Sequence, residues 1–279
     1  MTEKNFLADQ FEAHRGHLKA VAYRMLGSLT EADDAVQEAW LRLSRSDSDE
    51  IDNLGGWLTT VVARVSLNML RSRARFEPLE RVPDPIVTRD PSQEAELADS
   101  IGLALLVVLD TLAPAERLAF VLHDMFAVPF DEIGPMVGRT PTAARQLASR
   151  ARRRVQGTAV PDPDLSRQRE VLDAFMAASR NGDFDALVAV LHPDVVLRAD
   201  TGTVAETRGA ENVARGALTY GRWAAMARPV LVNGSMGLLT VVEDKPMAVM
   251  GLTIVDGRIV AMNILADPTR LAQLDLTFL

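Results

Sequence analysis

The sequence predicts a multidomain protein in which two all-α helical domains, the second with a helix-turn-helix, precede an α+β domain. Three observations predict this order. Apolar residues recur at helical spacing from Phe11 to about Phe76. Helical spacing resumes at Leu97 and continues to Val155. The C-terminal part of the chain then carries short helices followed by β-rich runs with turn residues between them.

Length and composition limit the classes of protein that this chain can belong to. With 279 residues, of which 48% are hydrophobic, the chain can bury several cores, and a net charge of −8 argues against indiscriminate coating of nucleic acid. The longest apolar run, Ile101–Leu109, is about half of a membrane span, and the N-terminus does not resemble a signal peptide. We therefore expect a soluble cytoplasmic protein with no membrane partner. The absence of cysteine and four scattered histidines predict no disulfide, metal or cofactor.

The first domain is predicted over residues 8–76. In "EADDAVQEAWLRL" the apolar residues keep to one helical face, and Ser28 or Thr30 can cap this helix. A second helix runs through "GGWLTTVVARVSLNMLRSRAR" and holds Arg64, Arg71 and Arg73 with no acid between them. A basic helical face of this kind points to nucleic acid.

The pattern breaks over residues 77–96. This stretch, "EPLERVPDPIVTRDPSQEAE", carries four prolines and several acids and has no sustained period. Such composition predicts an extended, negatively charged linker between separate domains.

The second domain is predicted over residues 97–157 and ends in an arginine-rich helix. Thr140 and Pro141 are typical of the N-cap and first position of a helix. The short segment "PFDEIGPMV" and the turn "GRT" come before it, which together predict a helix-turn-helix with the second helix as the DNA reader. Pro135 fits the first of these helices only if Asp131 caps it, so that the proline ring lies in the first turn.

Two faces are expected on the arginine-rich helix. An apolar stripe is formed by Ala144, Leu147, Ala148, Ala151 and Val155. The other side carries Thr142, Arg145, Gln146, Ser149 and Arg153. Arginine and glutamine pair with guanine and adenine edges in the major groove, and flanking arginines suit phosphates. Six arginines and no carboxylate between Gly138 and Val155 predict a field of one sign.

The third domain is predicted over residues 166–279. Helices in "RQREVLDAFMAASRNGDFDALVAVLHPD" precede several β-rich runs, and Asp256-Gly257 is a strong hairpin signal between two of them. Helices followed by an antiparallel sheet indicate an α+β domain.

The motifs quoted above resemble a known family. The stretches "ADDAVQEAWLRL", "GWLTTVVARVSLNMLRSRAR" and "LAPAERLAFVLHDMFAVPFDEIGPMVGRTPTAARQLASRARRRV" closely resemble an extracytoplasmic-function (ECF) sigma factor of bacterial RNA polymerase. The stretch "VLDAFMAASRNGDFDALVAVLHPDVVLRAD" resembles a SnoaL-like domain of the NTF2-like superfamily. The resemblance therefore implies sigma region 2, a linker, sigma region 4 and an NTF2-like cone, as in the ECF subgroup with such a fused domain.

The resemblance also implies roles for particular residues. The partners that it implies are core RNA polymerase, through the clamp of its largest subunit and its flap, and promoter DNA. The core polymerase contact falls on Asp34, Gln37, Glu38 and Trp40. Contacts with the −10 element, where a loop over 52–57 would capture a flipped base, fall on Asn53, Trp57, Arg64, Asn68, Arg71 and Arg73. Contacts with the −35 element fall on Arg139, Thr140, Thr142, Arg145, Gln146, Ser149, Arg150 and Arg153. The acidic linker would thread toward the polymerase active-site cleft.

Two stretches depart from the pattern of that subgroup. Its members often carry a tryptophan- and proline-rich signature in the linker and an Asn-Pro-Asp-Lys-Leu-like motif near the end. Here the linker reads "FEPLERVPDP" and the C-terminal stretch reads "ADPTRL", residues 266–271.

The function expected from these features is that of a sigma factor, not an enzyme, whose activity is modulated by contact between the C-terminal domain and the sigma domains. Two alternatives remain open on the sequence. A stand-alone helix-turn-helix repressor with a ligand-sensing domain would bind its operator tightly without polymerase. An NTF2-like enzyme fused to a DNA-binding module would need an acid and a hydrogen-bond donor in one pocket. The candidates for that chemistry are His192, Asp194, Asp200 and Tyr220.

Overall fold

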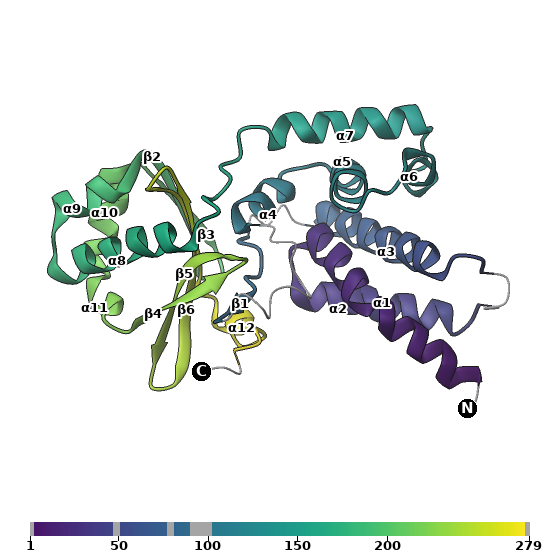
Figure 1. Cartoon of the computed structure of the whole chain (residues 1–279), viewed down its shortest axis with the longest axis horizontal. Helices are drawn as coiled ribbons and strands as arrows, with labels where there is room; N and C mark the ends of the chain where they lie inside the picture. The colour runs from purple at the N-terminus through teal and green to yellow at the C-terminus, as the bar shows by residue number, and fades with distance from the viewer. Residues whose placement is uncertain (1–2, 47–50, 77–80, 90–101, 277–279) are drawn as a thin grey trace. The chain divides into compact units, whose positions relative to one another are not determined.

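The computed structural model describes residues 3–46, 51–76, 81–89 and 102–276 (Figure 1). These residues form two compact units. The first combines residues 1–79 with residues 108–157, and the second combines residues 80–107 with residues 158–279. Most of the predicted linker, residues 77–80 and 90–96, lies outside the described residues, but residues 81–89 belong to the second unit.

Three long helices build one side of the first unit: α1 (Glu3–Leu26), α2 (Leu29–Leu43) and α3 (Leu54–Phe76). The predicted cap of α2 is confirmed, because the Ser28 hydroxyl accepts a hydrogen bond from the Glu31 amide at 3.4 Å. Alanines at 32, 35 and 39 are fully buried, which lets α2 approach its neighbours closely. Each of the three helices packs against the other two.

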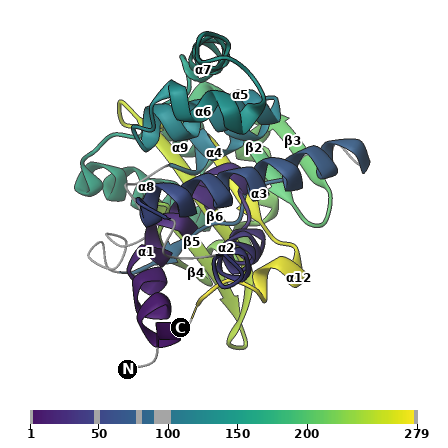
Figure 2. The same ribbon diagram turned by 90° about the vertical axis from the view of Figure 1, so that its right-hand side faces the viewer.

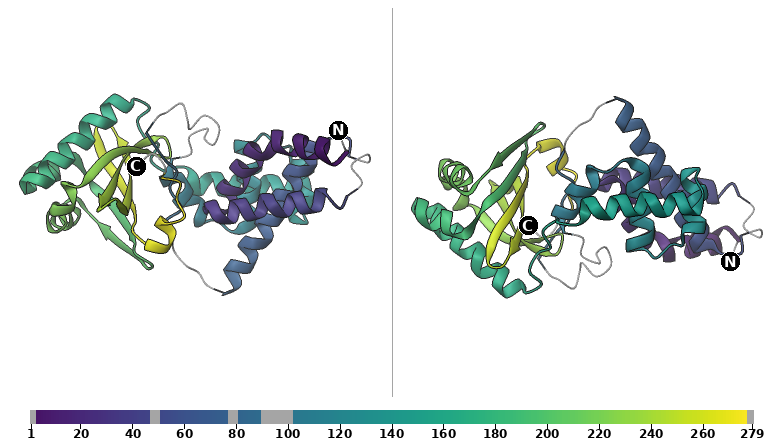
Figure 3. Two further views of the ribbon diagram at one scale, coloured as in Figure 1. Left: turned by 90° about the horizontal axis from the view of Figure 1, so that it is seen from below. Right: turned by 90° about the horizontal axis from the view of Figure 1, so that it is seen from above.

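The remaining helices of the first unit follow the linker. They are the C-terminal end of α4 (Leu103–Asp110), α5 (Pro114–Phe120), the π-helical turn η3 (Val121–Met125), α6 (Phe130–Val137) and α7 (Pro141–Val155). Figure 2 shows α5, α6 and α7 grouped together. In the two opposite views of Figure 3, α1 and α2 face the viewer in one and α7 in the other. The arginine-rich helix therefore lies on the opposite side of this unit from α1 and α2.

The expectation that Asp131 caps α6 is wrong. The helix begins at Phe130 after Pro129, with no side-chain cap, so that Pro135 lies inside the helix. The hydrogen bond that Pro135 cannot donate would go to the carbonyl of Asp131. Both residues are exposed, so water can take the place of that bond.

The second unit wraps a curved sheet around helices (Figure 1). Its helices are α8 (Leu165–Asn181), α9 (Phe184–Val190), α10 (Ala210–Thr219), α11 (Gly221–Ala224) and α12 (Pro268–Leu271). Its strands are β1 (Val87–Thr88), β2 (Leu191–Asp200), β3 (Val204–Arg208), β4 (Ala227–Val232), β5 (Ser235–Val242), β6 (Lys245–Val255) and β7 (Arg258–Leu265). The strand order is β1-β4-β5-β6-β7-β2-β3, and only β2 and β7 pair in parallel.

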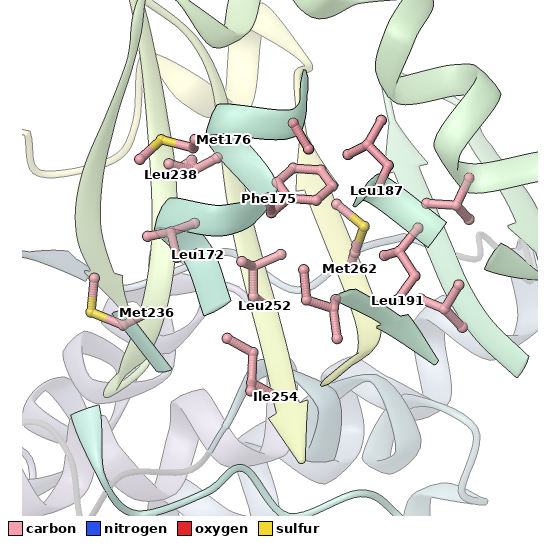
Figure 4. Packing of buried hydrophobic residues seen from close by; sticks show 14 of the residues in the cluster. Leu172, Phe175, Met176, Leu187, Leu191, Met236, Leu238, Leu252, Ile254 and Met262 are labelled. Atoms are coloured by element: carbon pink, nitrogen blue, oxygen red, sulfur yellow. The ribbon is translucent and has the colours of Figure 1, made fainter. Parts of the chain in front are cut away.

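Apolar side chains fill the space between α8 and the sheet. Figure 4 shows Phe175 and Leu172 of α8 packed toward Leu252 and Met262 of the sheet, and all four are at most 4% exposed. Buried aliphatic and aromatic side chains of this kind supply most of the free energy that holds such a cone closed.

The predicted fold class is confirmed in its order: all-α helices with a helix-turn-helix precede an α+β unit of helices and one curved sheet. The hairpin at Asp256-Gly257 is also confirmed, joining β6 to β7. The periodicity did not predict β1, β3 or α10. β1 has only two residues, and β3 is a short, largely exposed strand without an apolar run.

Candidate nucleic-acid interface

The turn before α7 fixes how the arginine-rich helix leaves α6. Gly138 adopts φ +67°, a left-handed conformation that glycine takes without strain. A Cβ atom on Gly134 would lie 2.8 Å from the carbonyl oxygen of Arg139, so only glycine allows this close approach. The predicted cap is confirmed, because the Thr140 hydroxyl accepts from the Ala143 amide at 3.2 Å.

The outer face of α7 presents the predicted −35 residues. Ala144, Ala148 and Ala151 are fully buried and turn the helix so that its opposite face is exposed. Exposed on and before the helix are Arg139, Thr140, Thr142, Arg145, Gln146, Ser149, Arg150 and Arg153. The Arg145 guanidinium lies 5.2 Å from the centre of the Phe130 ring, a cation–π contact that orients this side chain.

The prediction of a one-sign field on α7 is wrong in part. Arg150 forms an ion pair with Glu116 at 2.6 Å, and Arg152 forms one with Asp124 at 2.6 Å. Arg154 donates to the carbonyl oxygen of Thr111 at 3.2 Å. The partners come from α5, η3 and the loop before α5, which the local sequence of α7 does not contain.

Three of the predicted −10 residues share one face of α3. Arg64, Asn68 and Arg71 are separated by four and three residues, and all are exposed. In the part of the chain that the structure describes, Arg64 and Arg71 have no ion-pair partner. An exposed strip of donors with unpaired cations suits a nucleic-acid backbone.

The other three predicted −10 residues are half-buried or make contacts within the first unit. The Asn53 side chain accepts from the Gly56 amide at 3.0 Å, which caps the start of α3. Trp57 is half-buried in the first turn of the helix. Arg73 pairs with Glu31 and reaches the carbonyl oxygen of Leu26, so that it ties α3 to α1 and α2.

The predicted polymerase contact divides in the same way on α2. Asp34 and Gln37 are exposed, whereas Glu38 pairs with Arg42 at 2.8 Å. The Trp40 ring packs on Phe11 of α1 with centroids 5.1 Å apart. Leu41 is 39% exposed and lies one turn after Gln37.

The candidate enzymatic residues of the cone do not come together. Asp200 is 3% exposed and pairs with Arg270 at 2.7 Å, whereas Tyr220, between α10 and α11, is 66% exposed. The His192 ring accepts from the amide of its neighbour Asp194 at 3.1 Å. In addition, no group of acids and histidines that could hold a metal occurs in the described ranges.

A buried ion network joins the linker to the cone, and the sequence reasoning missed it. Arg270 donates to Asp84 of the linker at 3.0 Å, to Asp200 of β2 at 2.7 Å and to the carbonyl oxygen of Val82 at 2.5 Å. Asp84 is 6% exposed. Asp267 caps α12 and thereby positions Arg270 one turn away. The motif "ADPTRL" thus supplies both the cap and the cation.

Comparison with known proteins identifies the class first. Residues 10–76 match Sigma-70 region 2, and residues 102–155 match Sigma-70 region 4. Together with the two exposed basic faces, these matches define a promoter-specificity subunit of RNA polymerase, which is a transcription initiation factor and not an enzyme.

The particular group follows from relatives that match almost the whole chain. The ECF RNA polymerase sigma factor SigJ of Mycobacterium tuberculosis is 41% identical, over 94% of this chain and 92% of that protein. The probable ECF sigma factor SigI of the same species is 33% identical over 98% of both. The crystal structure of M. tuberculosis SigJ superposes with a TM-score of 0.78 at 38% identity, covering 96% of this chain and 99% of that one. The chain belongs to the ECF RNA polymerase sigma factors.

Among the described helices, none has the length and apolar character needed to cross a bilayer.

Proposed function

We propose a division of labour among three domains of this sigma factor. Residues 8–76 dock on the clamp of core polymerase and open the −10 element, and residues 97–157 bind the flap and read the −35 element. Residues 166–279 modulate both steps through the linker, residues 77–96. The protein works in the cytoplasm, where core polymerase and the promoter are found.

The observation that carries the DNA-reading part of this proposal is the geometry of α7. A side-chain cap at Thr140, a buried alanine stripe and an exposed face with Arg145 and Gln146 occur on one helix after a tight glycine turn. This is the arrangement by which a recognition helix places its first turns against base edges. The acids that pair with Arg150 and Arg152 hold α7 in the domain, while Arg139 and Arg153 remain for phosphates.

The modulating part rests on how the cone holds the linker. Residues 87 and 88 form β1, which pairs antiparallel with β4 at the edge of the sheet. The amide of Asn233 donates to the carbonyl oxygen of Ile86 at 2.9 Å, and its side chain accepts from the Ile86 amide at 3.1 Å. Strand addition of this kind fixes the peptide backbone, and the Arg270 network fixes its side chains.

A linker held as a strand of the cone cannot at the same time extend along the polymerase. Releasing it would break the hydrogen bonds from Arg270 to Asp84 and to the carbonyl oxygen of Val82, whereas Arg270 would keep its pair with Asp200. The loss of a largely buried ion pair opposes this release. The cone thus sets whether the domains on either side of the linker adopt the spacing that a promoter demands.

Run-off transcription with core polymerase tests this proposal. The full chain is compared with a form that ends at Gly157, on fragments of the source genome. We expect discrete transcripts that require the added protein, at a level that differs between the two forms. No transcripts and no complex with core enzyme would overturn the sigma role of the assigned domains. Equal polymerase binding and equal transcription by the two forms would overturn the role of the cone.

Two substitutions locate the effect at the linker. Arg270→Gln and Asp84→Asn should shift transcription toward the level of the form that ends at Gly157. Arg215→Gln is the matched control, because Arg215 pairs with Glu211 on the exposed face of α10 and has no hydrogen bond or ion pair with linker residues 81–89. Equal effects of all three substitutions would contradict a specific role for the network.

A further inference from the structure

The two helical sets of the first unit meet around one aromatic ring. Phe126, which follows η3, lies between two side chains of α1. The Arg24 guanidinium lies 4.9 Å from the ring centroid, and the His17 ring meets Phe126 edge-on with centroids 5.2 Å apart. Close by, Arg117 of α5 is 2% exposed and donates to the carbonyl oxygen of Arg24 at 3.1 Å.

The hydrogen bond of His17 fixes which ring nitrogen carries its proton. His17 Nε2 lies 3.2 Å from the hydroxyl oxygen of Thr59, and that hydroxyl donates to the carbonyl oxygen of Gly55 at 2.8 Å. Because the hydroxyl hydrogen is used, Thr59 accepts from His17, and Nε2 is the protonated nitrogen of the neutral ring. A second proton would therefore bind at Nδ1.

A cleft of about 300 Å³ gives solvent access to this ring. Its walls come from α1, the first turns of α3, the Phe126 loop and α6. The titratable and charged groups that line the cleft with His17 or lower its pKa are His14 and Arg24 on α1 and Glu132 on α6. The turn η3, which packs against α1, also carries His123 and Asp124. Asp124 is paired with Arg152, and from α3 the Thr59 hydroxyl lies within hydrogen-bond distance of the ring.

The closed contact disfavours a charged imidazole. Burial lowers the pKa of His17 below its ordinary value of 6.5, and the charges of His14 and Arg24 lower the pKa further. His17 as a whole is exposed to solvent, and the burial of its ring comes from the side that meets Phe126 edge-on. When Phe126 moves away, part of that burial is lost and the pKa rises. The separated form then binds more protons, so acidification favours separation.

We propose that His17 and Phe126 form a pH-sensitive latch between the −10-binding and −35-binding parts of this sigma factor, closed while the imidazole is neutral and released when it is protonated. The inference rests on the proposed assignment of those two parts. Each part must bind its own promoter element, so a contact that holds them together in the free protein opposes promoter binding.

A distance measurement in the free full-length protein tests the latch. The chain has no cysteine, so Ser44→Cys and Gln156→Cys provide unique labelling sites on exposed ends of α2 and α7. We expect energy transfer between the two labels to fall as the pH is lowered from 8 through 6.5 to 5.5. The ratio of open to closed forms should rise by at most about tenfold per pH unit, as for one proton.

Three variants separate the latch from a general effect of acid. His17→Gln keeps a side-chain donor for Thr59 and should stay closed at every pH. His14→Gln is the matched control: it should keep the transition and move it to higher pH, because one charge that lowers the pKa of His17 is removed. Phe126→Ala should be open at every pH.

A transition that persists unchanged in His17→Gln, or no transition in the parent protein, would overturn the latch. Circular dichroism at each pH confirms that the helices remain folded. Failure of the latch leaves run-off transcription at neutral pH intact, whereas failure of the proposed function removes the transcripts themselves, so the two results are distinguishable.

Discussion

The two basic helices, α3 and α7, are both rich in arginine, but they differ in whether those arginines are paired with groups of neighbouring elements. On α7, three of the six arginines from 138 to 155 are tied to side chains or carbonyls of neighbouring elements. On α3, Arg64 and Arg71 point outward without an ion-pair partner among the described residues, whereas Arg73 is paired with Glu31. Charge density along the sequence therefore overstates the charge that α7 offers to DNA.

This difference has a physical reason. A recognition helix must be held rigidly on its domain while its outer face is bound, and pairs such as Arg152 with Asp124 hold it there. α3 is held instead by buried aliphatic residues such as Leu58 and Leu67. The exposed guanidinium groups of Arg64 and Arg71 are therefore not needed to hold α3 in place.

The largest effect is expected when both outward arginines of α3 are removed. If Arg64 and Arg71 each contact nucleic acid, their removal costs about 1–3 kcal/mol each, so Arg64→Ala with Arg71→Ala should reduce open-complex formation at least about thirtyfold. Permanganate reactivity of the −10 element with core polymerase measures this loss. Binding of the variant to core enzyme alone is the control and should stay unchanged. If the double variant opened the −10 element normally, α3 would not contact that element.

The second effect concerns the reading face of α7. Gln146→Ala should weaken −35 binding by about 1–3 kcal/mol and relax the sequence preference at one base pair, because glutamine reads a base edge. Arg145→Ala should do the same at a neighbouring base pair. Competition binding with −35 variants measures both losses. Equal losses on every sequence would refute base reading by these two side chains.

Much of this site could be predicted from local sequence, because helix periodicity and caps are local properties. The cap at Thr140, the alanine stripe and the exposed face of α7 follow from spacing alone. The ion pairs of Arg150 and Arg152 could not be predicted, since Glu116 and Asp124 lie 34 and 28 residues away and reach α7 only through the fold.

The contacts that join the linker to the C-terminal domain could not be predicted from local sequence for the same reason. Asp84 and Arg270 are 186 residues apart, and β1 is too short to give a periodic signal. What the sequence did contain was the pair of stretches "VPDP" and "DPTRL", each an acid next to proline. Their meaning depends on a contact between distant segments, which periodicity does not report.

A third prediction tests whether Arg73, unlike Arg64 and Arg71, stabilises the fold of the first unit. Arg73→Ala should lower the free energy of unfolding by about 1–2 kcal/mol, because it breaks a partly buried pair with Glu31 and the contact with the Leu26 carbonyl. Thermal unfolding of the helical unit measures this loss in the free energy of unfolding. Glu31→Ala should cost a similar amount, and the double variant should cost less than the sum. If Arg73→Ala left the free energy of unfolding unchanged and strongly weakened DNA binding, Arg73 would contact the −10 element and would not stabilise the fold.

The smallest effect separates two neighbouring arginines of α7. Arg153 is exposed without an ion-pair partner among the described residues, so Arg153→Ala should reduce the slope of log K against log salt by about 0.9, the value for one phosphate contact. Arg150→Ala should leave that slope nearly unchanged and cost at most about 1 kcal/mol of stability, because Arg150 is paired with Glu116. Titrations of promoter binding at several salt concentrations measure both slopes. Equal slopes for the two variants would mean that Arg150 leaves Glu116 for a phosphate when DNA binds, and that the anchored arginines of α7 also contact DNA.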